Sequence, residues 1–144
     1  AVISILAAPA SFINASLVMK YGMRLLATIG FALQIIFALG ILVILNTSIF
    51  SDQLFLIIFV IWSTIAFFLK GLYFGNLNAL AMEPMGEIAG MAAAIIGASA
   101  TMIGILIAVF IGLAFDGTAT PVLLGYIICS AIALLLMVSQ KKTK

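Results

Sequence analysis

Residues that could do chemistry are few in this chain, and two acids stand out by their spacing. Glu83 and Glu87 are four residues apart, which would place two carboxylates on one face of a helix. Pro84 and Gly86 interrupt this segment, however, because proline disfavours helix at the residue before it. We therefore favour a solvated turn followed by a helix N-terminus, where acids are favourable, over a catalytic pair.

The composition excludes most other catalytic and metal-binding chemistry. The chain has no histidine and one cysteine, Cys129. A nucleophile activated by a histidine base and a cysteine or histidine zinc site both need residues that are absent. We expect no enzyme activity, no catalytic residue, no metal and no cofactor. A net charge of +2 gives no electrostatic footprint for nucleic acid, so we expect no nucleic-acid partner either.

One apolar segment carries side chains suited to binding a small molecule. Trp62, Tyr73 and Asn76 share one face of a helix, and Lys70 lies at the edge of that face. Such a face suits a partly wet cavity for flat, apolar or cationic molecules, so these four residues are the substrate-cavity candidates. The alternative is an aromatic belt with ordinary helix packing. For Lys70 we favour extension of the side chain to the membrane surface or to a lipid headgroup.

Glycines mark the faces on which helices would approach one another. Gly71 and Gly75 form a GxxxG motif opposite the aromatic face, and Gly90, Gly97 and Gly104 belong to a stripe of small residues along the next segment. Small residues let helix backbones touch in lipid. We predict that these five glycines are helix-packing positions.

These residues belong to a chain with the composition of a membrane protein. Of its 144 residues 67% are hydrophobic and 7% charged, with a mean hydropathy of +1.46. A soluble domain is typically close to half apolar and a quarter charged. Polar turns divide the chain into about five transmembrane helices of an all-α integral membrane protein, with the lipid bilayer as its surroundings. The expected spans are residues 2–18, 25–45, 54–82, 88–114 and 121–139.

The basic residues predict an orientation. Lys20 and Arg24 lie in the first loop, and three further lysines form the C-terminal tail, whereas the loops at 46–53 and 115–120 carry no base. The positive-inside rule places the first loop and the C-terminus in the cytoplasm. Since the chain starts at Ala1 rather than at a methionine, we expect it to be a fragment of a longer membrane protein.

Residues 75–94 resemble a known family. An asparagine-rich helix end leads to Glu-Pro-x-Gly and then to Ala-Gly-x-Ala. This stretch is similar to the junction of helices 10 and 11 in drug exporters of the major facilitator superfamily, and most similar to the Bcr/CflA-type multidrug efflux group.

Residues 15–24 resemble the second copy of the loop motif of the same superfamily. Leu17, Gly22 and Arg24 match the motif, and Lys20 is a conservative replacement. Two positions depart from it: Met19 stands where the motif has an aspartate, and Ala15 where it has its first glycine.

The resemblance implies that the five spans are helices 8 to 12 of a twelve-helix transporter in the bacterial inner membrane. It implies proton-coupled efflux of drug-like, amphipathic molecules, with the first, third and fourth spans lining the cavity. The proton-coupling acid would lie in the missing N-terminal half. Two alternatives stay open: a major facilitator carrier of a metabolite, and a small, non-transporting subunit that packs against partners through its glycines.

Overall fold

The structure, a computed structural model, describes residues 9–47 and 51–139. Within these ranges the regular structure is helical and contains no strand, which confirms the all-α prediction. The elements are α2 (Pro9–Tyr21), α3 (Met23–Asn46), α4 (Asp52–Met82), the short 3-10 segment η1 (Glu83–Ile88), α5 (Ala89–Leu113) and α6 (Thr120–Ser139).

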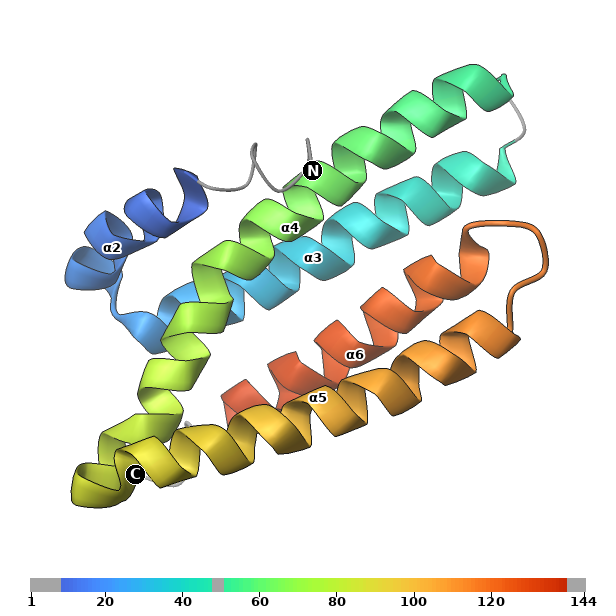
Figure 1. Ribbon diagram of the computed structural model, residues 1–144. Helices are drawn as coiled ribbons and strands as arrows, with labels where there is room; N and C mark the ends of the chain where they lie inside the picture. The colour runs from blue at the N-terminus through green and yellow to red at the C-terminus, as the bar shows by residue number, and fades with distance from the viewer. Residues whose placement is uncertain (1–8, 48–50, 140–144) are drawn as a thin grey trace.

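Three helical stretches among the described residues are long and apolar enough to cross a membrane: Met23–Leu45, Gln53–Leu113 and Thr120–Ser139. The second has 61 residues and would reach about 90 Å if straight, three times the hydrocarbon core of a bilayer. It is not straight, because the chain turns back at η1 (Figure 1). The expected spans 54–82 and 88–114 are thus the two arms of one helical run. Of the expected span 2–18, residues 2–8 lie outside the described residues.

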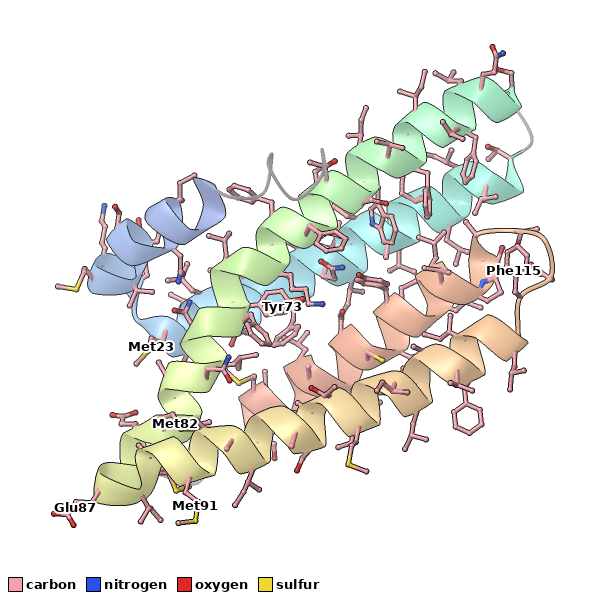
Figure 2. The ribbon with its side chains drawn as sticks, in the orientation of Figure 1. Met23, Tyr73, Met82, Glu87, Met91 and Phe115 are labelled. Atoms are coloured by element: carbon pink, nitrogen blue, oxygen red, sulfur yellow. The ribbon has the colours of Figure 1, made fainter. Side chains whose placement is uncertain are left out.

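Gly86 makes this reversal possible. Its φ of 50° and ψ of −124° are conformations that side chains rarely adopt, whereas glycine adopts them without steric cost. Pro84 stands at the first turn of η1, where a missing N–H costs no hydrogen bond. Glu83 and Glu87 are both exposed here, so the carboxylates lie in a solvated turn. Figure 2 shows Glu87 at the extreme end of the molecule.

The described helix ends lie at two opposite ends of the structure. In Figure 1 the α2–α3 junction, η1 and the end of α6 lie at one end, while the end of α3, the start of α4 and the α5–α6 connection lie at the other. Lys20 and Arg24 flank the α2–α3 junction. These two bases therefore lie at the opposite end from the α5–α6 loop, which carries no base, and the orientation in the membrane stays a prediction. The tail lysines Lys141, Lys142 and Lys144 lie outside the described residues.

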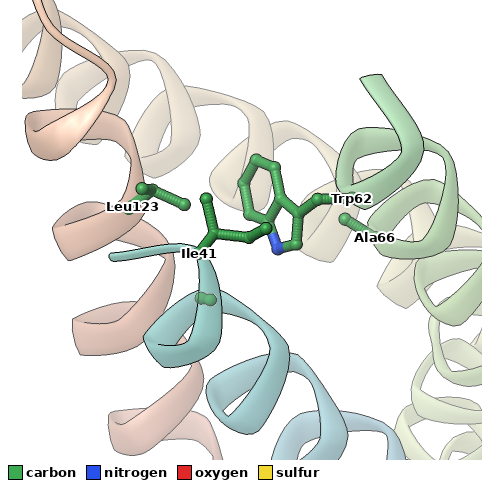
Figure 3. Close-up of a cluster of buried hydrophobic side chains, with 5 residues drawn as sticks. Ile41, Trp62, Ala66 and Leu123 are labelled. Carbon is green, nitrogen blue, oxygen red and sulfur yellow. The ribbon is translucent and has the colours of Figure 1, made fainter. Parts of the chain in front are cut away.

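Helices α3, α4 and α6 enclose the main buried cluster. Ala38 and Ile41 of α3 meet Trp62 and Ala66 of α4 and Leu123 of α6 (Figure 3). All five side chains are at most 8% exposed. Close packing of this kind holds helices together by dispersion contacts, which remain available in lipid.

Helix α5 is largely uncovered, because none of its residues is buried and most are exposed. A Cβ atom added at Gly90, Gly97 or Gly104 would meet nothing within 4 Å. The three glycines that predicted close packing therefore make no close helix contact among the described residues. Gly75 of α4 is open in the same way, and Gly71 is half-buried.

Candidate functional site

A pocket of about 380 Å³ lies among α3, α4, α5 and α6. This volume falls within the range of sites that hold small molecules. The polar residues of its lining are Lys70, Tyr73, Tyr126, Cys129 and Ser130. The other lining residues are Phe31, Ile107, Ala108 and Ile111, with Gly104 and Gly125. A second pocket among α2, α3 and α4 is lined mainly by leucines and has almost no polar surface. The first is therefore the candidate site.

A glycine on α3 sets the position of Tyr73. A Cβ atom at Gly30 would lie 2.7 Å from Cδ1 of Tyr73, so only glycine leaves room for the ring in this place. The Tyr73 ring then packs against Phe31, with 4.5 Å between ring centroids and 37° between their planes. Tilted aromatic pairs at this distance are favourable beyond the area that they bury. Figure 2 shows Tyr73 in the C-terminal half of α4, beside α3. This contact forms one wall of the pocket.

A second glycine brings α5 to α6. A Cβ atom at Gly125 would collide with the side chain of Ile111, approaching its Cγ1 to 2.9 Å. The next residue, Tyr126, meets Trp62 edge to face, with 5.3 Å between centroids and 74° between planes. Gly125 and Tyr126 thus link the pocket both to α5 and to the buried cluster.

Lys70 is the one formal charge among the residues that line this pocket. The acids whose side chains the structure describes are Glu83, Glu87 and Asp116, which lie in η1 and in the α5–α6 loop. Lys70 forms no ion pair within the described part of the chain, and its side chain is exposed. An ammonium group midway along an apolar helix without an acidic partner is costly in a membrane and is usually functional.

The structure separates the four predicted cavity residues. Lys70 and Tyr73 line the pocket. Trp62 does not line it, because its ring is 4% exposed and packs within the α3–α4–α6 cluster. Asn76 is 3% exposed and bonds across to α2. The aromatic face predicted from the sequence therefore meets three different environments along α4.

Asn76 forms a reciprocal amide pair with Asn14 of α2. Asn14 Nδ2 donates to Asn76 Oδ1 at 3.1 Å, and Asn76 Nδ2 donates to Asn14 Oδ1 at 2.9 Å. Asn76 Nδ2 also donates to the carbonyl oxygen of Leu72 at 2.7 Å. Both amides have hydrogen-bond partners, which polar groups need where water is scarce. This pair ties α2 to α4.

The predicted loop-motif residues lie in α2, at the α2–α3 junction and at the start of α3. Gly22 has a φ of 79° and is the one residue between the two helices, so the loop expected at this place is very short. Lys20 lies in the last turn of α2 with Nζ 5.3 Å from the Tyr21 ring centroid, and Arg24 lies in the first turn of α3. Leu17 lines the apolar second pocket.

Sequence reasoning missed several residues that build the site. Four of these residues belong to no sequence motif, because their roles depend on which helices become neighbours: Phe31, Tyr126, Gly30 and Gly125. Gln34 did offer a signal, since a polar residue within an apolar span is unusual. Gln34 does not line the pocket; it is 1% exposed, and neither Oε1 nor Nε2 has a hydrogen-bond partner among the described residues.

No group of three or more His, Cys, Asp or Glu side chains that could hold a metal occurs in residues 9–47 and 51–139. Comparison with models of protein families gave no match, and neither a curated protein nor a solved structure matches the chain. The fold and the pocket define the class of this protein as all-helical, with helices long and apolar enough to span a membrane.

Proposed function

We propose that the chain is the C-terminal part of a membrane carrier that exports amphipathic, drug-like molecules in exchange for protons. The observation that carries this proposal is the pocket among α3, α4, α5 and α6, which combines aromatic rings with Lys70, two tyrosines and a serine inside apolar helices. A pocket that is mainly apolar with a few polar groups suits an amphipathic ligand that a carrier binds from one side of the membrane and releases on the other.

The uncovered face of α5 supports further helices beside this chain. A Cβ atom at Gly90 or Gly97 would meet nothing within 4 Å, whereas small stripes in lipid are typical of close helix contacts. In the proposed carrier these contacts come from the N-terminal half, which would also supply the proton-coupling acid. We place the carrier in the bacterial inner membrane with its C-terminus in the cytoplasm, and we assign it to the Bcr/CflA-type efflux group of the major facilitator superfamily. No enzyme activity is proposed.

The same uncovered face favours a second candidate, a non-transporting subunit that packs against partners through α5. A metabolite carrier of the same superfamily is a variant of the first proposal. Reading the frame upstream of Ala1 separates the candidates, because a carrier requires about seven further spans there and a subunit requires a start codon directly before Ala1.

The experiment is a resistance and efflux profile for several drugs in cells that express the full-length protein. Tyr73→Ala removes one pocket wall, and Phe74→Ala is its matched control, because Phe74 is the adjacent aromatic residue and is 58% exposed. We expect Tyr73→Ala to change the relative efflux of the compounds by up to about thirtyfold, and a protonophore to abolish efflux. A uniform decrease that follows protein amount in both variants would contradict the proposal.

A further inference from the structure

The charge of the pocket suggests which molecules it takes. Aromatic rings attract cations as well as flat apolar groups, so rings alone do not decide the sign of the ligand. Lys70 does bear on the sign of the ligand charge, because it lines the same pocket as Tyr73 and Tyr126 and has no acidic partner among the described residues. A cationic ligand in this pocket would meet a like charge in surroundings that screen it weakly.

We propose that the pocket binds amphipathic anions, with the ligand carboxylate or phosphate against Lys70 and its apolar body against Phe31, Tyr73 and Tyr126. This inference rests on the proposed function and narrows its substrate class. An anion there would give Lys70 the counter-charge that no described residue supplies. Charged hydrogen bonds of this type are about twice as strong as neutral ones.

Two further polar side chains in the lining fit an anionic group. Ser130 is 6% exposed, and it lines the pocket together with Tyr126, one turn away on α6. Hydroxyl groups donate to carboxylate oxygens, and neither residue brings a negative charge. The pocket therefore holds one cation, several hydroxyl donors and a mainly apolar remainder, which matches an organic anion of one or two rings in about 380 Å³.

The test is equilibrium binding to the purified full-length protein in nanodiscs, with three probes of nearly equal size. These are 1-naphthoate, 1-naphthylmethylamine and 1-naphthalenemethanol, which are anionic, cationic and neutral at pH 7. We expect 1-naphthoate to bind most tightly and the amine most weakly. Lys70→Gln should weaken naphthoate binding about tenfold or more and should spare the neutral alcohol. Lys70→Arg should retain the preference for the anion. Lys20→Gln controls for the loss of one positive charge, because Lys20 lies in the last turn of α2 and does not line the pocket.

Lipid composition separates the two sources of such an anion. If naphthoate binds equally in phosphatidylcholine and phosphatidylglycerol nanodiscs, the site takes a free anion. If phosphatidylglycerol abolishes naphthoate binding in the wild type, a lipid headgroup occupies Lys70. Equal binding of the amine and the carboxylate, or a Lys70→Gln variant that keeps the full preference for the carboxylate, would overturn the inference.

Failure of the anion-binding inference is distinguishable from failure of the proposed carrier function. Lys70-dependent binding of naphthoate without any efflux would leave the anion site in place and refute the carrier. Efflux of amines and carboxylates at equal rates would support the carrier and refute the anion site.

Discussion

Replacing Gly30 by alanine tests the contact between α3 and α4 that positions Tyr73. The new Cβ atom would lie 2.7 Å from Cδ1 of Tyr73, whereas ordinary contact begins at 3.4 Å. The two groups must therefore separate by about 0.7 Å. The ring cannot simply turn aside, because it is packed against Phe31 with 4.5 Å between centroids.

The expected change in the free energy of unfolding of Gly30→Ala follows from two opposing effects, overpacking and helix propensity. Forcing extra atoms into a filled contact costs about 1–3 kcal/mol. Alanine in place of glycine recovers about 0.5–1 kcal/mol in a helix. We expect Gly30→Ala to lower the free energy of unfolding by about 0.5–2 kcal/mol, and Gly30→Val to lower it further, because a branched side chain adds two more carbon atoms.

Gly40 supplies the matched control on the same helix. A Cβ atom there would meet nothing within 4 Å. Gly40→Ala should be neutral or slightly stabilising, since helix propensity is then the main effect. The assay is unfolding of the purified full-length variants in mixed micelles by added dodecyl sulfate, followed by circular dichroism. Equal unfolding midpoints for Gly30→Ala and Gly40→Ala would refute the close approach of α3 to Tyr73.

Three further predictions follow from the described contacts. Trp62→Ala should lower the amount of folded protein and the efflux of all substrates in the same proportion, because the ring lies in the helix contact and not in the pocket. The measurement is an efflux profile normalised to expression, and a change in substrate preference would contradict this placement of Trp62. The pKa of Asp116 is lowered by the hydrogen bonds that the Thr118 hydroxyl and backbone N–H donate to its carboxylate at 2.6 Å and 2.9 Å. This lowered pKa stabilises the folded turn above the ordinary aspartate range, and the stabilisation is lost as the pH falls through the lowered value. Thr118→Val removes the hydroxyl donor, so it should raise the pKa of Asp116 in a ¹³C NMR titration. An unchanged pKa of Asp116 would argue against the hydroxyl as the main cause. Gly97→Leu should abolish transport or assembly while Ile95→Leu is tolerated, because the open face at Gly97 is where further helices are expected; normal efflux by Gly97→Leu would mean that this face meets only lipid.

The helices could be predicted well from the sequence, because composition and punctuation act locally. The span expected at 25–45 is α3 from Met23 to Asn46, and the span expected at 121–139 is α6 from Thr120 to Ser139. The break expected at 83–87 coincides with η1 and depends on Gly86. Apolar length, proline and glycine determine these features without reference to the neighbouring helices.

The site was harder to predict, because periodicity shows which residues share a face and not what that face meets. Trp62, Tyr73 and Asn76 do lie along one helix, but they meet a packed cluster, a pocket and α2 respectively. The glycines that allow close contacts are Gly30 and Gly125, which belong to no repeated spacing. Their roles arise from the positions of Tyr73 and Ile111 on other helices, which the spacing of residues along one helix does not encode.

Labelling of Cys129 tests most directly whether the pocket is a substrate site. This is the one cysteine of the chain, it is exposed, and it lines the pocket. In the full-length protein with cysteines outside this chain replaced, the rate of Cys129 alkylation by a small maleimide should fall as a transported compound is added, with half-protection at the concentration that half-saturates efflux. An alkylation rate that stays constant while efflux saturates would contradict a substrate site among α3, α4, α5 and α6.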